Sequence, residues 1–467
     1  MYRLQLAAIL LALCSGPLLA APGPFDAKAR EIYARVIAME TTSRARQVPA
    51  MAEYLAAEFR AGGFPAADVR VLPLRDSASL VVRYRGNGRG GRPILLLSHM
   101  DVVEAKREDW KRDPFQLIEE NGYFYGRGTI DIKNGVTALT TVFLRLKSEG
   151  FVPSRDLIIY FSGDEETAQF TTLDAARNHR DLIDAEFALN TDAGGGTLDE
   201  TTGQPLVYSI QTAEKIYADF ELTTRNQGGH SSQPREDNAI YELAAALGRL
   251  AAFRFPVMYN DTTRASLRGA GEKTAGALGE AMRRFADDPF DAAAADTVSG
   301  DPSYIGHLRT TCVATMLRGG HSANALPQSA TATVNCRIFP GVAVATVQHA
   351  LEQIAGPGIE VKVSGNVIWS DASPLRDDVV AAVTRAVRQR YPGIPVAPLQ
   401  ESSATDGAVF RGVGIPTYGV AEWFLRRSEF LAHGRDERNS VRSFYDGIEQ
   451  WYVLLKDLAG PPRGKRK

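Results

Sequence analysis

The chain has 467 residues, of which 44% are hydrophobic and 23% are charged, as in an ordinary globular protein. This length exceeds that of a typical single core, so we expect two domains or three. The formal net charge is −2 and no basic face is evident, which argues against a nucleic-acid partner.

The first twenty residues have the pattern of a secretory signal peptide. Arg3 supplies a positive charge, residues 4–13 form an apolar core, and the small residues Ala20 and Ala21 follow. We therefore predict a signal peptide at residues 1–20 and export of the chain to the periplasm or the exterior. A membrane anchor is the alternative, but the apolar run is too short to span a bilayer comfortably, and no later run is long enough. We expect no membrane partner after cleavage.

The cysteines leave two questions open. Cys14 raises lipidation as a further alternative, although the large Leu13 before it differs from the small residue of a lipoprotein signal. Cys312 and Cys336 remain after cleavage, each inside a strand-like run. An oxidising compartment permits a disulfide between them, and two buried thiols in neighbouring strands fit the sequence equally well.

Strands and helices alternate in the first half of the mature chain. Residues 25–62 have the apolar spacing of helices, residues 69–74 and 79–84 resemble strands, and an amphipathic helix follows Gly135. This alternation predicts the α/β class, with a mainly parallel central sheet flanked by helices.

Three short apolar runs in this half end in residues that can bind a metal ion. They are residues 93–97 followed by His99 and Asp101, residues 156–162 followed by Asp164, Glu165 and Glu166, and residues 185–190 followed by Asp192. Strands that are apolar throughout are buried on both faces, and parallel strands bind ligands at their carboxyl ends. Three such strand ends together imply one site.

The pattern changes after about Gly203. Strand-like runs at residues 215–224, 310–317, 330–339 and 359–363 alternate with helical segments at 238–252 and 344–354. A long Ala-rich segment, residues 254–302, is partly helical, and the sequence leaves its role open. We predict a catalytic domain in two parts, residues 21–207 and 371–467, with an inserted α+β lid or dimerisation domain at residues 208–370.

The chain supplies the ligand types of a hydrolytic zinc site, which needs nitrogen and carboxylate ligands and an open position for water. A two-metal site, with ions about 3.5–4 Å apart, also needs a carboxylate that can bridge them. The candidates are His99, Asp101, Asp131, Asp164, Glu165, Glu166, Asp192 and His433. Any one acid is weak evidence because acids are usually solvated, but three acid-tipped strands are hard to explain by solvation.

Four motifs carry a resemblance to a known family. They are Ser98–Asp101, Gly126–Lys133, Gly163–Glu166 and Asn190–Asp192. In order and spacing they resemble the co-catalytic zinc family of glutamate carboxypeptidase, carboxypeptidase S, acetylornithine deacetylase, succinyl-diaminopimelate desuccinylase and aminoacylase. The resemblance covers nearly all of the mature chain, and the loop from Asp101 to Phe115 is most similar to carboxypeptidase S.

The resemblance implies two zinc ions per subunit, for which other divalent ions such as Co²⁺ can substitute. The implied ligands are Asp131 as the bridge, His99 and Asp192 at one ion, and Glu166 and His433 at the other. Glu165 would be the general base that takes a proton from the metal-bridging water and passes it to the leaving amine. Asp101 would fix the tautomer of His99. The alternative is that Asp101 is an acidic residue of a turn with no role at the metal site.

The resemblance extends to the lid, in the motifs Gly228–Ser232, Gly319–Pro327 and Asn335–Arg337. His230 would stabilise the oxyanion, in its own site or in that of a partner subunit. Asn324 and Arg337 would hold a substrate carboxylate, which the planar fork of arginine can meet with two hydrogen bonds. The alternatives are a capping histidine for His230 and a surface ion pair for Arg337.

The sequence also departs from the family pattern. Asn134 stands where a second glycine often follows the lysine, and we expect the turn to survive because asparagine tolerates left-handed backbone angles. Residues 254–302 are longer than in compact members, which puts lid geometry in doubt.

The predicted function is that of an exported dinuclear zinc hydrolase cleaving an amide or peptide bond next to a free carboxylate, like a carboxypeptidase or dipeptidase. An N-acyl-amino-acid deacylase is the alternative, and a non-catalytic binding protein on the same fold is a distant one. The intact Glu165 and ligand set argue against the last. The expected partners are a small peptide or N-acyl amino acid, and a second copy bound through the lid. The sequence does not decide the side-chain preference or the oligomeric state.

Overall fold

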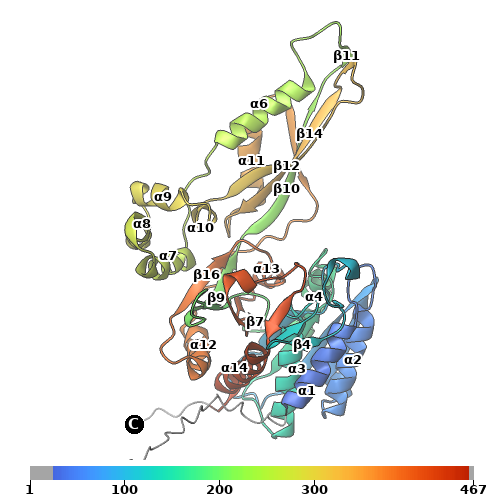
Figure 1. Ribbon diagram of the computed structural model, residues 1–467, viewed down its shortest axis with the longest axis vertical. Coiled ribbons are helices and arrows are strands. Elements are labelled where there is room, and N and C mark those ends of the chain that lie inside the picture. Colours follow the sequence, from blue (N-terminus) through green and yellow to red (C-terminus); the bar gives the residue numbers. More distant parts are fainter. Residues whose placement is uncertain (1–24, 462–467) are drawn as a thin grey trace, which may run out of the picture.

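A computed structural model describes residues 25–461, so the predicted signal peptide at 1–20 lies outside the described residues. Figure 1 shows a catalytic domain and an elongated lid that rises from it. Between residues 25 and 461, no helix combines the length and apolar character needed to cross a membrane.

A ten-stranded mixed sheet, counted over the described residues, forms the centre of the catalytic domain. In spatial order the strands are β1 (Val69–Leu74), β2 (Ser77–Tyr84), β6 (Leu157–Ser162), β3 (Ile94–His99), β7 (Phe187–Asn190), β17 (Thr417–Gly419), β9 (Pro205–Glu214), β8 (Gly195–Leu198) and β18 (Phe424–Leu425), with β16 (Val396–Glu401) paired to β9. The central strands β6, β3, β7 and β17 run parallel to one another, and β2 and β9, on either side of them, run antiparallel. The predicted α/β class is confirmed.

Helices cover both faces of this sheet. Along β3, Ile94 and Leu96 belong to one core cluster, and Leu95 and Leu97 to another, because successive strand residues point to opposite faces. The larger core packs against α1 (Asp26–Ala38), α2 (Val48–Ala61), α3 (Lys133–Ser148), α12 (Asp377–Arg390) and α14 (Val441–Ala459). The smaller one packs against α4 (Phe170–Asn178), α5 (Arg180–Ile183) and α13 (Gly407–Gly412). A strand buried on both faces explains the continuous apolar run in the sequence.

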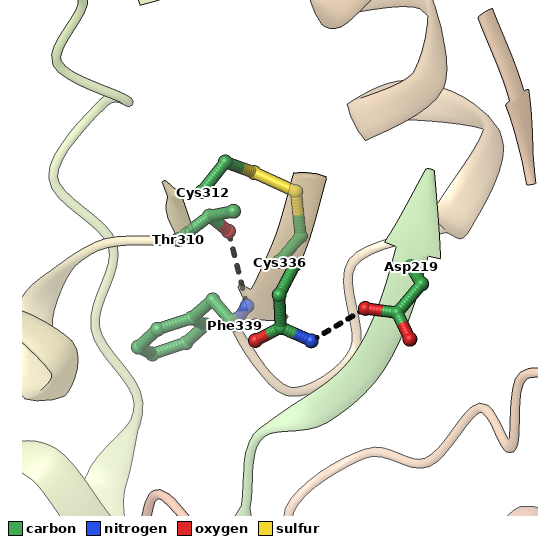
Figure 2. Close-up of a disulfide and its surroundings, with 6 residues drawn as sticks. Asp219, Thr310, Cys312, Cys336 and Phe339 are labelled. Carbon is green, nitrogen blue, oxygen red and sulfur yellow. Dashed lines mark hydrogen bonds between the residues drawn. A yellow bond between two sulfur atoms is a disulfide. The ribbon is translucent and has the colours of Figure 1, made fainter. Parts of the chain in front are cut away.

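The lid is a four-stranded antiparallel sheet with helices packed on its apolar face. The strand order is β12 (Thr311–Gly319), β14 (Ser329–Ile338), β10 (Ile216–Arg225) and β15 (Ile359–Ser364), and the helices are α6 (Ala239–Ala252) and α11 (Val344–Ala355). Cys312 and Cys336 lie directly opposite each other on β12 and β14 and form a disulfide (Figure 2). Of the two arrangements that the sequence left open, the structure contains the disulfide.

The chain enters the lid through a single residue. β9 belongs to the central sheet and ends at Glu214, and β10 of the lid sheet begins at Ile216, so Lys215 alone separates them. The boundary that we predict between residues 207 and 208 therefore falls inside β9. Strand patterning shows that a segment is extended, but not which of two sheets it joins.

Residues 254–302 contribute most of a helical module between the two domains. Its helices are α7 (Asp261–Lys273), α8 (Gly276–Asp287), α9 (Ala292–Ser299) and α10 (Ile305–Leu308). Leu267, Met282 and Phe285 form part of a separate core there. α7 packs against β16, so this module also contacts the catalytic domain.

Two small sheets complete the described chain. β11 (Gly229–His230) pairs with β13 (Ala325–Leu326) at the end of the lid farthest from the catalytic domain (Figure 1). β4 (Ile118–Glu120), β5 (Tyr123–Tyr125) and β19 (Arg438–Ser440) form a three-stranded sheet that joins the two parts of the catalytic domain.

Candidate active site

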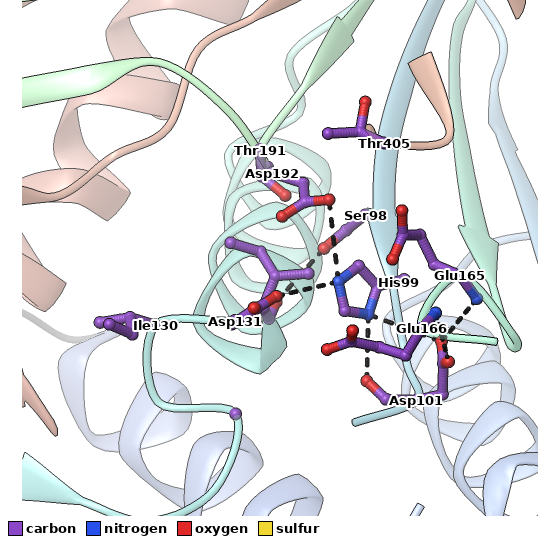
Figure 3. A network of polar contacts seen from close by, with 12 residues as sticks. Ser98, His99, Asp101, Ile130, Asp131, Glu165, Glu166, Thr191, Asp192 and Thr405 are labelled. Atoms are coloured by element: carbon purple, nitrogen blue, oxygen red, sulfur yellow. Dashed lines mark hydrogen bonds and ion pairs between the residues drawn. The ribbon is translucent and has the colours of Figure 1, made fainter. Parts of the chain in front are cut away.

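The three acid-tipped strands meet at one edge of the central sheet. His99 ends β3, Glu165 and Glu166 follow β6, and Asp192 follows β7. Figure 3 shows their side chains turned toward one another, together with Asp131 from the loop before α3. The parallel registers of β3 with β6 and β7 bring these strand ends together.

Asp131 lies between two histidines. Its Oδ1 is 3.1 Å from Nε2 of His99, and its Oδ2 is 3.0 Å from Nε2 of His433. The same His99 nitrogen lies 3.8 Å from Oδ2 of Asp192, and the same His433 nitrogen lies 3.0 Å from Glu166. Two groups of candidate ligands result, and Asp131 belongs to both.

These separations fit a metal ion in each group. Ligand atoms about 2.0–2.1 Å from a tetrahedral zinc ion lie roughly 3.3 Å from one another. Within each group, the candidate ligand atoms all lie within 4.8 Å of one another. Burial raises the pKa of Asp192 well above its usual range, with further increases from Asp131 and Glu166, although His99 opposes the shift. A bound cation would offset the repulsion among these carboxylates.

The tautomer of His99 is set by Asp101, mainly through its backbone. Nδ1 of His99 lies 3.0 Å from the carbonyl oxygen of Asp101 and 3.5 Å from its carboxylate. A proton held at Nδ1 leaves Nε2 free for a metal ion. The Asp101 carboxylate instead accepts the backbone N–H groups of Glu165 and Glu166, at 3.1 and 3.0 Å. Asp101 thus orients both the histidine and the two glutamates.

Glu165 belongs to neither ligand group in the described chain. Its Oε1 accepts a hydrogen bond of 2.9 Å from the amide of Gln169. Burial raises the pKa of Glu165 well above its usual range, with contributions from Asp192 and Asp406, and His99 opposes this. A carboxyl group whose neutral form is favoured can hold a proton and release it.

Asp164, the first acid after β6, has a structural role. Its carboxylate accepts the backbone N–H groups of Phe170 and Thr171 at 2.8 and 2.9 Å, at the start of α4. It is a helix cap. Of the three consecutive acids, only Glu165 and Glu166 face the cluster of candidate ligands.

Glu437 is a site residue that sequence reasoning missed. It is fully buried, forms an ion pair with Arg127, and accepts backbone N–H groups from Gly128, Ile130 and Asp131. The same Arg127 donates to the carbonyl of Gly434, next to His433, at 2.9 Å. The pair therefore holds the Asp131 loop against the His433 loop. No motif marks Glu437, because its partners come from a distant part of the chain.

The structure corrects our expectation for Asn134. This residue lies in the first turn of α3 and has no positive φ, so it needs no tolerance of left-handed angles. Its side-chain amide donates to Oε1 of Glu422 at 2.6 Å. The substitution for glycine therefore adds a buried hydrogen bond.

The three lid residues lie at opposite ends of the lid. His230 and Asn324 are exposed neighbours at its far tip, where the N–H of Ser231 donates to the Asn324 carbonyl at 3.0 Å. Nδ1 of His230 lies 2.7 Å from the hydroxyl of Ser232. Arg337 lies at the base of the lid, on β14, and donates to the carbonyl of Ser402 at 2.8 Å. Within one chain, only Arg337 lies near the catalytic domain.

The fold and the site are those of a metal-dependent hydrolase. The chain belongs to peptidase family M20/M25/M40, whose family model matches residues 95–457. The predicted family resemblance is therefore confirmed. Members of this family are hydrolytic enzymes of the metallopeptidase and amidohydrolase class, which sets aside a non-catalytic binding protein.

Three curated relatives show the range of the family. N-fatty-acyl-amino acid synthase/hydrolase PM20D1 of Homo sapiens is 27% identical over 388 residues, covering 80% of this chain and 75% of the relative. Probable carboxypeptidase S-like 2 of Dictyostelium discoideum is 27% identical, covering 81% and 74%. Aminoacylase-1 of Homo sapiens is 26% identical, covering 79% and 80%.

Solved structures share the fold over nearly the whole chain. The M20 family metallo-carboxypeptidase Sso-CP2 from Sulfolobus solfataricus aligns with a TM-score of 0.69 at 17% identity, covering 92% of this chain and 99% of that one. Human carnosine dipeptidase 1 aligns with a TM-score of 0.61 at 16% identity, covering 94% and 98%. At these identities, the likeness supports the catalytic domain and inserted lid as a common architecture.

Proposed function

We propose that the protein is a dinuclear zinc hydrolase that cleaves an amide or peptide bond next to a free carboxylate. The observation that carries this proposal is the position of Asp131, with one carboxylate oxygen facing His99 and the other facing His433. A carboxylate held between two nitrogen ligands is suited to bridge two ions. The family membership and its hydrolytic relatives support the reaction class.

In this proposal, five side chains hold the ions. They are His99 and Asp192 on one side, Glu166 and His433 on the other, and Asp131 between them. When bound, the ions would polarise the scissile carbonyl and lower the pKa of water. Co²⁺ would bind the same nitrogen and oxygen ligands.

Glu165 is proposed as the general base. It takes a proton from the attacking water and donates it to the leaving amine, which cannot depart easily as an anion. Asp101 positions this base through the Glu165 backbone N–H, and Gln169 holds the side chain from the other side. Free rotation of the carboxyl group is thereby restricted.

His230 and Asn324 are proposed to act in a partner subunit's site. β11, which carries His230 and pairs with the strand after Asn324, lies at the tip of the lid, remote from the central sheet whose strand ends carry candidate metal ligands of the same chain (Figure 1). β12, at the edge of the lid sheet, exposes Val313, Met316 and Leu317, which suits a homodimer formed through the lid. In such a dimer, His230 would donate to the oxyanion of the partner's substrate. Mixing inactive His230→Ala and Glu165→Gln chains should then restore activity, whereas catalysis within one chain predicts none.

The substrate is proposed to be a small peptide or an N-acyl amino acid. A peptidase is supported by the similarity to a carboxypeptidase S-like relative, and N-acyl hydrolysis by the names of two other relatives. Both substrates present an amide bond and a free carboxylate, so one site serves either. Arg337, at the base of the lid, is the proposed contact of that carboxylate.

Export is proposed on two grounds. Residues 1–20 have the pattern of a signal peptide, and Cys312 and Cys336 form a disulfide of the kind that persists in oxidising compartments.

The function is tested by hydrolysis of dipeptides and N-acetyl amino acids before and after chelation. We expect activity on at least one class, loss of that activity with a chelator, and recovery with Zn²⁺ or Co²⁺. Activity that survives removal of all bound metal would contradict the proposal.

A further inference from the structure

A cavity of about 480 Å³ connects the candidate catalytic residues with the base of the lid. One wall consists of Glu165, Glu166 and the loop that follows them. The lining also includes Lys215 and Tyr217, at the point where the chain passes from the central sheet into the lid. A substrate whose scissile bond lies beside Glu165 would therefore extend toward Lys215.

Lys215 is a buried lysine without an acidic partner. It is 1% exposed, and its ammonium donates to the backbone carbonyl of Arg309 at 2.5 Å. Among the described residues, no carboxylate lies within ion-pair distance of it, and Arg337 is the charged neighbour. An ammonium has three protons, so two remain for a ligand. Burying such a charge unpaired is unfavourable, and a bound anion would remove the penalty.

Arg337 lies beside Lys215 and likewise has no acidic partner in residues 25–461. It is directly opposite Tyr217 in the β10–β14 register, and its guanidinium carbon lies 4.7 Å from the centre of the Tyr217 ring. Its Nη1 donates to Ser402, close to Ala404, which lines the cavity. Burial lowers the pKa of Lys215 to about 7, with a further decrease from Arg337. A bound anion would favour the charged form of Lys215.

The lid geometry limits which groups can act together. The family resemblance pairs Asn324 with Arg337 as carboxylate ligands, but Asn324 lies at the far tip of the lid. Within one chain, Lys215 lies two residues before Tyr217, the partner of Arg337 in the strand register, and its ammonium is 5.4 Å from the centre of the Phe339 ring, two residues after Arg337. A planar guanidinium and a point-like ammonium can bind the two oxygens of one carboxylate without competing for the same position.

We propose that Lys215 is a specificity-determining residue, which together with Arg337 binds the free carboxylate of the substrate at the lid end of this cavity. This inference deepens the proposed function and depends on it. The occupant is the carboxylate of a peptide's C-terminal residue or of an N-acyl amino acid. Lys215 thereby selects substrates that end in a carboxylate over those that end in a carboxamide.

The test compares substrates that differ only in that group. The zinc-loaded protein is assayed with Ala-Leu and N-acetyl-leucine, and with the carboxamide of each. Lys215→Met should raise KM for the carboxylate substrate roughly 10- to 100-fold, as expected for a lost hydrogen bond to a charged group, with little change in kcat. The kcat/KM for the carboxamide should stay within about twofold of wild type, and Lys215→Arg should recover part of the selectivity, because it restores the charge.

A matched control is Lys362→Met, which removes an exposed lysine from β15 of the lid. Lys362→Met should change neither the KM for the carboxylate substrate nor the KM for the carboxamide. Equal losses on carboxylate and carboxamide substrates would assign Lys215 a purely structural role at the lid base and overturn the inference. In that case the proposed function would stand, since chelator-sensitive hydrolysis would persist.

Calorimetry with free leucine provides a measurement that does not depend on turnover. If the zinc-loaded protein hydrolyses neither dipeptides nor N-acetyl amino acids of any side chain, the proposed function fails. Leucine binding then decides the inference: it should weaken at least 10-fold in Lys215→Met and remain unchanged in Lys362→Met. The proposal would be overturned if Lys215→Met bound leucine as tightly as wild type. It would also be overturned if wild type bound no leucine.

Discussion

His433 lies 3.0 Å from Asp131, although the two residues come from opposite ends of the catalytic domain's sequence. His433 is exposed and has a φ of 60°, a left-handed conformation that is uncommon for residues other than glycine. Arg127 and Glu437 hold the surrounding loop in place. The two halves of the chain are therefore joined at the candidate metal site itself.

Replacing Glu165 should stop catalysis without removing the metal. Glu165→Gln keeps the size of the side chain but cannot accept a proton, and general-base catalysis contributes about 10²- to 10⁴-fold to a rate. We expect kcat to fall by a factor of about 10² to 10⁴. Bound zinc, measured by elemental analysis, should stay at the wild-type level. An unaltered kcat would exclude Glu165 as the base.

Replacing Glu437 should destabilise the protein and weaken metal binding. Glu437→Gln leaves the buried Arg127 without its ion-pair partner, which costs about 3–5 kcal/mol in comparable cases. Urea denaturation should show this loss, and the zinc affinity should fall because the Asp131 loop loses its anchor. The control is Glu449→Gln, whose exposed pair with Arg145 should contribute less than about 1 kcal/mol. Equal effects of the two substitutions would contradict the assigned role.

The sequence predicted the candidate metal ligands of this site better than the residues that hold those ligands in position. Apolar runs that end in His99, Glu166 and Asp192 reveal their positions, because strand burial and strand ends leave a pattern in the sequence. Glu437 leaves none, since its contacts depend on how distant loops meet. The same limit explains why the predicted lid boundary falls inside β9 rather than at Lys215. It also explains why the sequence did not reveal that Asp101 acts through its backbone carbonyl as well as its carboxylate.

The lid residues show a second limit. His230, Asn324 and Arg337 were grouped by resemblance, yet the structure separates the first two from the third along the length of the lid. Motif order carries no information about distances within an inserted domain. Residues 254–302 were likewise expected only to be partly helical, and the packing of α7 against β16 has no sequence signal.

Stability should fall in mild acid because of His307. Burial, together with the nearby charge of Lys215, lowers the pKa of His307 to about 4. The unfolded chain, with a pKa near 6.5, binds this proton first. The stability from neutral His307 is therefore complete above about pH 6.5 and is lost as the pH falls toward 4.

Because proton binding to His307 is coupled to unfolding, the free energy of unfolding should be lower by roughly 2 kcal/mol at pH 5 than at neutral pH. In His307→Gln, the difference in unfolding free energy between pH 7.5 and pH 5 should shrink by about this amount. His349→Gln, at an exposed position, is the control for a general effect of replacing a histidine. If the unfolding free energy depended on pH in the same way in wild type and in His307→Gln, His307 would not be the group responsible for the loss of stability.

The disulfide should stabilise the lid. Cys312 and Cys336 are 24 positions apart, and closing a loop of that length contributes about 3 kcal/mol in the chain-entropy model. Replacing both by alanine should lower the unfolding free energy by about this amount, measured by urea denaturation without reductant. Adding reductant should destabilise the wild type and leave the double variant unaffected. Equal sensitivity of both proteins would show that another process is being measured.

The most direct test is a crystal structure of the zinc-loaded protein with anomalous data collected at the zinc edge. The proposed function predicts two peaks about 3.5–4 Å apart, one on each side of the Asp131 carboxylate. One peak should lie beside His99 and Asp192, and the other beside Glu166 and His433. A single peak, or peaks out of reach of Asp131, would contradict a bridged pair of ions.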